Sequence, residues 1–232
     1  MGLWPEWQWN EIQQVGTDYT DVAEVQRYES RMQQFRDLAA EDQAILAELN
    51  LPPNARVLEI GTGTGHFART AARAGCTVVA LDVSPVMLEY AASRAREENL
   101  TSIEFRHAGF LTFSCPPASF DAAVSVAVLH HLPDLWKAVA LHRVHEVLKP
   151  GGRFLLRDVV FSWEGGNHAA AFDGFVNGLP TSMRTEAARH IAKEYSTLDW
   201  IMHGLLERAG FNVLRAERTQ ASFVHYLCEK AD

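Results

Sequence analysis

Three glycines fall within five positions in the segment VLEIGTGTGHFA, residues 57–68, directly after a run of apolar residues. A backbone with so little side chain allows a ligand to approach it closely. The motif is informative because a strand is predicted before it and a helix after it. Its ligand is a dinucleotide's pyrophosphate, a nucleotide's phosphates, or a group that carries no phosphate.

The glycine spacing and a nearby carboxylate argue against a dinucleotide. Gly61, Gly63 and Gly65 spell GxGxG, whereas the dinucleotide fingerprint has its third glycine one position later, where this chain has His66. Glu59 lies two residues before the first glycine, at the end of the predicted strand. A carboxylate there repels a pyrophosphate but suits an ammonium or a sulfonium. An NAD-dependent oxidoreductase is therefore the less favoured reading.

Asp82 ends the second predicted strand, about 20 residues after Gly61, the distance at which dinucleotide-binding sheets place a ribose-binding acid. A carboxylate at that edge of the sheet can accept hydrogen bonds from both ribose hydroxyls. Asp82 could instead cap the next helix, but Ser84 already supplies the N-cap and Pro85 the first helical residue. A ribose-binding acid without a phosphate cradle predicts a nucleoside ligand.

Short apolar strands and amphipathic helices alternate between residues 54 and 161, which predicts an α/β fold. The right-handed crossovers that such alternation requires give a doubly wound, mostly parallel sheet with helices on both faces. Residues 162–195 break the rhythm and read as loop and short helices, and 197–210 read as a helix. Residues 211–230 read as two strands joined by a turn. We expect this C-terminal hairpin to close the sheet in the antiparallel sense.

The chain divides into an N-terminal helical arm or lid at 1–50 and a Rossmann-like domain at 51–232, with an insert at about 161–195. Three tryptophans precede the helices of the arm, namely Trp4, Trp7 and Trp9. We expect these rings to pack the arm onto the domain, although an aromatic lid over the substrate is the alternative.

The composition is that of a globular protein, with 47% hydrophobic and 22% charged residues among 232. A net charge of -8 argues against nucleic acid as the main partner, because phosphate binding needs a basic face. Cys76, Cys115 and Cys228 form no CxxC pair and indicate neither a disulfide framework nor zinc. With no signal-peptide pattern and no apolar run long enough for a membrane span, we expect a cytoplasmic protein.

Four motifs occur in order along the chain: VLEIGTGTG, ALDVSPVMLEYA, SFDAAVSVAVLHHLPD and VLKPGGRFLLRD. Together they resemble the class I S-adenosylmethionine-dependent methyltransferases, especially the small-molecule branch similar to the ubiquinone and menaquinone biosynthesis enzymes. The resemblance covers roughly residues 54–160 and the C-terminal hairpin. It implies a seven-stranded sheet whose last strand is antiparallel, S-adenosyl-L-methionine as cofactor with S-adenosyl-L-homocysteine as product, and a small-molecule acceptor. A non-methylating S-adenosylmethionine-binding protein or regulator on the same fold is the alternative, because fold does not fix chemistry.

The resemblance also implies roles for individual residues. The glycine loop would let the backbone approach the methionine and ribose parts, Glu59 would hold the amino end, and Asp82 would bind the ribose. The remaining cofactor contacts would come from Val83 and Met87 at the adenine, Val126 at the methionine part, Thr62 within the loop, and Tyr19 closing over the cofactor from the arm, with Tyr28 as a second such tyrosine.

One position departs from the family pattern. The family usually has an aspartate after the third strand that accepts a hydrogen bond from the adenine amino group, whereas this chain reads Ala108-Gly109-Phe110. Phe110 can still cover the adenine ring. The hydrogen bond of the missing aspartate, worth about 1 kcal/mol, is lost or passes to backbone or water.

Two residues are candidates for proton transfer. His131, in LHHLPD after the fourth predicted strand, could accept a proton from a substrate hydroxyl or amine, while the alternative is that His130 and His131 only shape the loop. Asp158 ends the fifth strand and could orient or deprotonate the substrate, or pair with Arg157 instead. Oxygen, nitrogen, carbon and sulfur acceptors all stay open, as do a monomer and a homodimer.

No metal site is expected from the sequence. His142 and His145 lie three residues apart on a predicted helix and could join His130 and His131. No neighbouring carboxylate or cysteine completes a ligand set in the sequence pattern.

Overall fold

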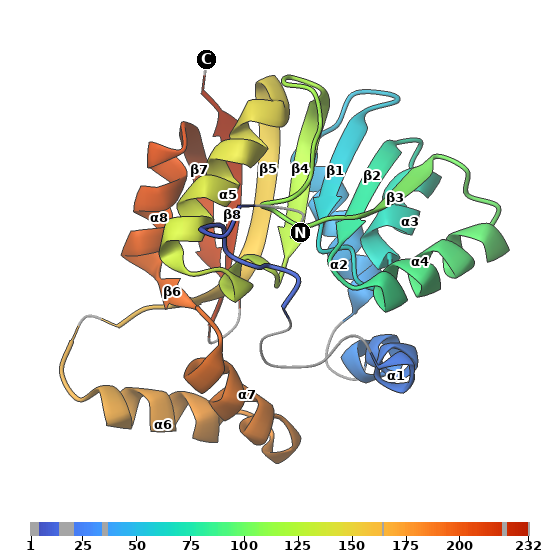
Figure 1. Ribbon diagram of the computed structural model, residues 1–232. Coiled ribbons are helices and arrows are strands. Elements are labelled where there is room, and N and C mark those ends of the chain that lie inside the picture. The colour runs from blue at the N-terminus through green and yellow to red at the C-terminus, as the bar shows by residue number, and fades with distance from the viewer. Residues whose placement is uncertain (1–4, 14–20, 34–36, 164, 220–221, 232) are drawn as a thin grey trace.

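The computed structural model describes residues 5–13, 21–33, 37–163, 165–219 and 222–231. Within them one sheet runs in the order β3-β2-β1-β4-β5-β8-β7 (Figure 1). The strands are β1 (Arg56–Ile60), β2 (Thr77–Asp82), β3 (Ile103–His107), β4 (Phe120–Val126), β5 (Leu148–Phe161), β6 (Thr197–Leu198), β7 (Phe211–Arg218) and β8 (Phe223–Lys230).

The sheet confirms the expected doubly wound α/β fold. β1 to β5 pair in parallel, and β8 pairs antiparallel with both β5 and β7. The two-residue strand β6 was expected to be the start of a helix. It instead pairs in parallel with the end of β5 and makes an eighth strand off the main path. A short strand before a helix start has no periodicity of its own, so the sequence pattern could not reveal it.

Helices cover both faces of the sheet. They are α1 (Val22–Gln33), α2 (Leu38–Leu49), α3 (His66–Arg73), α4 (Pro85–Glu97), the short 3-10 helix η1 (Leu129–His131), α5 (Asp134–Val147), α6 (His168–Gly178), α7 (Thr181–Lys193) and α8 (Asp199–Arg208). One core cluster joins the sheet to α5 and α8, and a second joins it to α2 and α3. Neighbouring strand residues therefore point to opposite cores, as Val57 and Leu58 do, and both are buried.

One helix of the expected N-terminal arm belongs to the packed domain. Helix α2 packs against α3 and contributes Ile45 and Leu49 to the core, so it belongs to the helical layer of the domain. Among the described residues before α2, residues 5–13 and α1 lie outside that layer.

Two tryptophans attach the segment 5–13 to the domain, as expected. Trp9 packs edge-on against Tyr195 with ring centroids 5.4 Å apart, and Trp7 stacks on Trp136 of α5 at 6.4 Å. Trp4 lies outside the described residues.

The insert forms two helices, α6 and α7, which lie away from the sheet at the bottom of Figure 1. Neither helix buries a residue completely. Phe172 and Phe175 pack edge-on against Phe161, with ring centroids 5.6 and 5.4 Å away. These rings thus hold α6 to the end of β5. Across the described chain, helices are too short or too polar to cross a membrane.

Candidate active site

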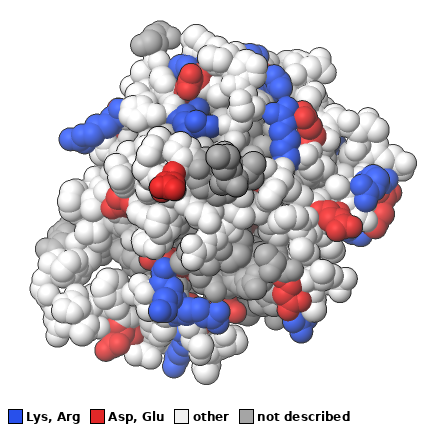
Figure 2. All heavy atoms as spheres, viewed as in Figure 1, with Lys and Arg blue, Asp and Glu red and all other residues white. Residues whose placement is uncertain are grey.

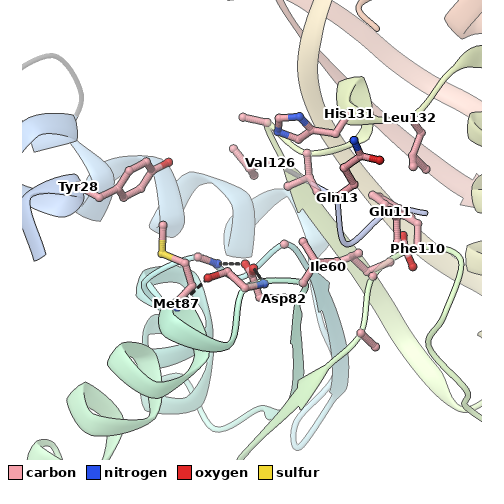
Figure 3. Close-up of a pocket in the computed structure, with 18 residues that line it drawn as sticks. Glu11, Gln13, Tyr28, Ile60, Asp82, Met87, Phe110, Val126, His131 and Leu132 are labelled. Atoms are coloured by element: carbon pink, nitrogen blue, oxygen red, sulfur yellow. Dashed lines mark hydrogen bonds between the residues drawn. The ribbon is translucent and has the colours of Figure 1, made fainter. Parts of the chain in front are cut away.

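A cavity of about 870 Å³, counted with its open mouth, lies at the carboxyl ends of β1, β2 and β4 (Figure 3). This is the edge at which open α/β sheets bind ligands. Its lining consists of Glu11, Gln13, Tyr28, Ile60, Gly61, Gly63, Asp82, Val83, Ser84, Met87, Ala108, Gly109, Phe110, Val126, Ala127, Val128, His131 and Leu132.

Asp82 is held in place at the floor of this cavity by two backbone donors. Gly63 N donates to Oδ2 and Ser84 N donates to Oδ1, each at 2.8 Å. Burial raises the pKa of this carboxyl, although both hydrogen bonds act in the opposite direction. Each oxygen keeps further lone-pair capacity, so the carboxylate can accept from a pair of ligand hydroxyls.

The three glycines of the loop differ in how much space a Cβ would have at each position. All have positive φ, which glycine adopts at no steric cost. A Cβ on Gly61 would meet the Val128 side chain at 2.2 Å, and one on Gly65 would meet Ala91 Cβ at 2.8 Å. A Cβ on Gly63 would have nothing within 4 Å. Gly65 therefore permits the close approach of the glycine loop to Ala91 of α4, and Gly61 and Gly63 line the cavity.

Glu59 lies behind the glycine loop and is not among the residues that line the cavity. It is 6% exposed and accepts a hydrogen bond of 2.6 Å from Thr62 Oγ1. Burial raises the pKa of Glu59 to about 8, and the negative charges of Asp42 and Asp82 act in the same direction. Ionisation of this group is therefore unfavourable unless a positive charge comes close to it.

The segment 5–13 fills the position beside Gly109. Glu11 accepts from Leu111 N at 2.9 Å and from Thr112 Oγ1 at 2.7 Å. A Cβ built on Gly109 would lie 2.5 Å from Glu11 Oε2. The carboxylate of Glu11 thus occupies the space that a side chain at position 109 would need. Burial raises its pKa, against the effect of these hydrogen bonds.

His131 lies on the opposite side of the cavity from Tyr28 and Met87 (Figure 3). Burial lowers the pKa of His131 to about 4, and the adjacent His130 acts in the same direction. The imidazole is therefore neutral at neutral pH and can accept a hydrogen bond or a proton.

Asp158 is not among the described residues that line the cavity. It is fully buried, pairs with His130 Nδ1, and accepts from the backbone N–H groups of His130 and Val159 at 3.1 and 2.7 Å. Burial opposes ionisation, but the charge of His130 outweighs it and lowers the pKa of Asp158. Arg157 pairs with Glu41 instead. In this arrangement Asp158 holds His130, and its expected contact with the substrate stays a prediction.

The charge of the lining is one-sided. Glu11 and Asp82 contribute carboxylates, and no Lys or Arg is found among the described residues around the cavity. On the face shown in Figure 2, basic side chains are scattered and interspersed with acidic ones. Such a cavity suits a cationic or neutral ligand and repels phosphate groups.

Nine of the expected site residues line the cavity: Gly61, Gly63, Asp82, Val83, Met87, Gly109, Phe110, Val126 and His131. Glu59, Thr62 and Gly65 are adjacent but lie beneath the lining, and Tyr19 lies outside the described residues. Tyr28 does line the cavity, as the second expected tyrosine.

Sequence reasoning missed Glu11 and Gln13, because nothing in the sequence links residues so distant from position 109 in the chain. It also missed Ala127, whose φ of 58° is unusual for a residue with a Cβ. No spacing rule indicates such a conformation, but it is of the kind that gathers at functional sites.

Residues 57–152 match the family model described as a methyltransferase domain. An uncharacterised methyltransferase from Bacillus mycoides is 28% identical over 205 residues, covering 86% of this chain and 92% of that protein. An uncharacterised methyltransferase from Anoxybacillus flavithermus is 26% identical with the same coverage.

Solved structures with the same fold include proteins of different activity. A Burkholderia thailandensis 1,6-didemethyltoxoflavin N1-methyltransferase is 22% identical with a TM-score of 0.62, covering 90% of this chain and 89% of that one. The cyclase SpnF is 20% identical with a TM-score of 0.67, covering 83% and 80%. The narrower expectation of a ubiquinone or menaquinone branch stays a prediction. The ordered motifs, the matched methyltransferase domain, the relatives and the shared fold together support a class I S-adenosylmethionine-dependent methyltransferase.

Proposed function

We propose that the enzyme transfers the methyl group of S-adenosylmethionine to a small-molecule acceptor within the cavity at the sheet edge. The observation that carries this proposal is the acidic lining without a basic side chain, because it suits a sulfonium and disfavours a phosphate-bearing cofactor. The enclosed position and apolar walls favour a small acceptor rather than a polymer.

The expected cofactor roles agree with where the side chains lie. Asp82 would receive both ribose hydroxyls, while Val83, Met87 and Phe110 provide apolar surface for the adenine. Glu59 would stabilise the positive end of the methionine part through the loop or a water molecule, since it lies beneath the lining.

Glu11 would take over the role of the aspartate that position 109 lacks. Its carboxylate lies where a side chain at 109 would be, next to Val83 and Phe110. Its two hydrogen bonds to residues 111 and 112 orient it and leave acceptor capacity for an amino group. The adenine would thus be recognised by the arm and not by the loop after β3.

The transfer itself would depend on alignment. The acceptor atom attacks the methyl carbon, the sulfur–methyl bond breaks with its electrons moving to sulfur, and S-adenosylhomocysteine forms. Positioning can contribute on the order of 7–11 kcal/mol in favourable intramolecular cases. His131 would orient the acceptor and receive its proton where the acceptor is a hydroxyl or amine.

The cofactor assignment is tested by calorimetry with Asp82→Ala. We expect wild type to bind S-adenosylmethionine and S-adenosylhomocysteine in the micromolar range and not NAD. The variant should bind at least tenfold more weakly, since it loses charge-assisted hydrogen bonds worth about 1.5–3 kcal/mol each. Asp121→Ala is the matched control, because Asp121 also accepts a backbone N–H, from Arg56, but at the start of β4. Wild-type binding of NAD in place of either sulfur nucleoside would reject the proposal.

Glu11→Ala tests adenine recognition by the arm. Wild type should prefer S-adenosylhomocysteine over S-inosylhomocysteine, which carries an oxygen in place of the amino group. The variant should lose most of that preference, because no carboxylate then faces the base. Glu6→Ala, at an exposed position of the same segment, should keep it. An unchanged preference in Glu11→Ala would exclude Glu11 as the amino acceptor.

Glu59→Gln should improve stability and impair binding. In wild type the folded pKa of about 8 lies above the ordinary 4.5, so between these values the folded state holds a proton that the unfolded state has lost. Stability from this group therefore falls as pH rises through that interval. We expect the variant to melt at least about 2 °C higher than wild type at pH 8, with a smaller difference at pH 5, and to bind S-adenosylmethionine about tenfold more weakly.

The exposed Glu104→Gln is the control for this effect. Equal binding by wild type and Glu59→Gln would remove Glu59 from the cofactor site, and equal melting at both pH values would show that its burial has no effect on stability.

His131→Ala should lower turnover without loosening the cofactor. In a screen of hydroxyl and amine acceptors read out as S-adenosylhomocysteine release, we expect a decrease of about 100-fold or more. The dissociation constant for S-adenosylmethionine should stay within about twofold. The control is His142→Ala on the exposed side of α5. If His131→Ala keeps the wild-type turnover, His131 does not accept the proton, and alignment of the two substrates accounts for the transfer.

A further inference from the structure

Three side chains outside the cavity bring potential metal ligands together. Ligand atoms of His130, His190 and Glu194 all lie within 4.8 Å of one another. They come from η1, from α7 and from the residue directly after α7, so the fold and not a local motif assembles them. The expectation of no metal site considered only histidines close in sequence.

The remaining nitrogen of each histidine is already engaged. His130 Nδ1 pairs with Asp158, and His190 Nε2 is 2.6 Å from Ser196 Oγ. These partners turn His130 Nε2 and His190 Nδ1 toward the same atom, Glu194 Oε2, at 3.2 and 2.5 Å. Metal-bound histidines characteristically use their second nitrogen in this way, because the outer partner fixes the ring and its tautomer.

The cluster is enclosed and its parts are fixed in place. The side chains of His130, Glu194 and His190 are 7%, 10% and 17% exposed. Tyr195 N donates to His130 O at 2.8 Å, which ties the residue after Glu194 to η1. Thr197 Oγ1 donates to Asp134 at 3.0 Å, and β6 continues the attachment along β5.

Two imidazoles and one carboxylate suit zinc and neighbouring transition metals rather than magnesium or calcium, which prefer oxygen ligands. Bonds of about 2.1 Å in tetrahedral geometry put ligand atoms about 3.4 Å apart. The separation between His130 and Glu194 is already close to this value. The separation between His190 and Glu194 must open by about 1 Å, at the more exposed end of the cluster. Three protein ligands leave a fourth coordination position for water.

We propose that His130, His190 and Glu194 bind a divalent first-row transition metal ion, for which Zn²⁺ is the probe, and that the ion fastens α7 to η1. The site goes beyond methyl transfer and does not depend on the identity of the acceptor. Without the ion, the same residues are held by shared protons as a chain of salt bridges. The experiment distinguishes these two states.

The test uses the full chain after removal of metal with a chelator, titrated with Zn²⁺ by calorimetry. We expect one tight site per chain and a rise in melting temperature on adding Zn²⁺, because a ligand that binds only the folded state stabilises it. His190→Ala and Glu194→Gln should each weaken this site at least tenfold and abolish the rise. His203→Ala is the matched control, since His203 also pairs with a glutamate, Glu207, but on α8. Co²⁺ should give a visible absorption band in wild type and His203→Ala only.

Ser196→Ala keeps all three proposed ligands, so it provides a second test if the other variants fail to fold. Loss of this outer partner should weaken Zn²⁺ binding by about 10-fold or more. Equal binding by wild type, His190→Ala and Glu194→Gln would mean binding by other histidines and would overturn the proposal. If wild type binds Zn²⁺ no more tightly than these variants do, the three residues form salt bridges only and the proposal is rejected.

Discussion

The carboxylate of Asp82 connects the parts of the site that must stay in register. It ends β2, accepts from Gly63 in the loop after β1, and accepts from Ser84 at the start of α4. Ser84 in turn caps α4 through Met87 N, so the residue beneath the expected adenine position is set by the same connection. Without this carboxylate, the backbone N–H groups of Gly63 and Ser84 would lose their acceptor at the cavity, and the connection between the two strand–helix loops would be weaker.

A second wall of the cavity is formed by the segment 5–13, which is about 100 residues from Gly109 in the sequence. The site is therefore assembled by tertiary contacts. Residues 5–13 lie along the loop after β3, and Glu11 fills the space beside Gly109. Glycine at 109 and glutamate at 11 are therefore linked: a larger side chain at 109 would displace the arm. A cofactor that contacts both walls would stabilise the attachment of the arm, because its binding free energy would depend on the closed arrangement.

Much of this site could be predicted from the sequence, and the failures have physical reasons. Alternating strands and helices predict a parallel sheet, and such a sheet places Asp82, Gly61 and Gly63 at one edge, where the structure has the cavity. Gly65 was assigned to the cofactor because a motif does not reveal which glycine serves packing; here the contact is with Ala91. Asp158 was expected at the substrate because it lies near the end of its strand, but its carboxylate pairs with His130 and is not among the lining residues.

The two halves of the sheet edge balance their buried negative charge in different ways. Beside β5, Asp158 has a partner in His130, whose pKa rises to about 9 because Asp158 and Glu194 outweigh the effect of burial. Beside β1, Glu59 has the Thr62 hydroxyl and the Ala68 backbone as hydrogen-bond donors and the carboxylates of Asp42 and Asp82 nearby, and its pKa rises instead. A buried carboxylate without an internal cation destabilises the folded protein at neutral and higher pH. Under the proposed function that free energy would be recovered when a cationic ligand arrives, so the feature that makes the β1 side less stable would also favour the ammonium end of the methionine part.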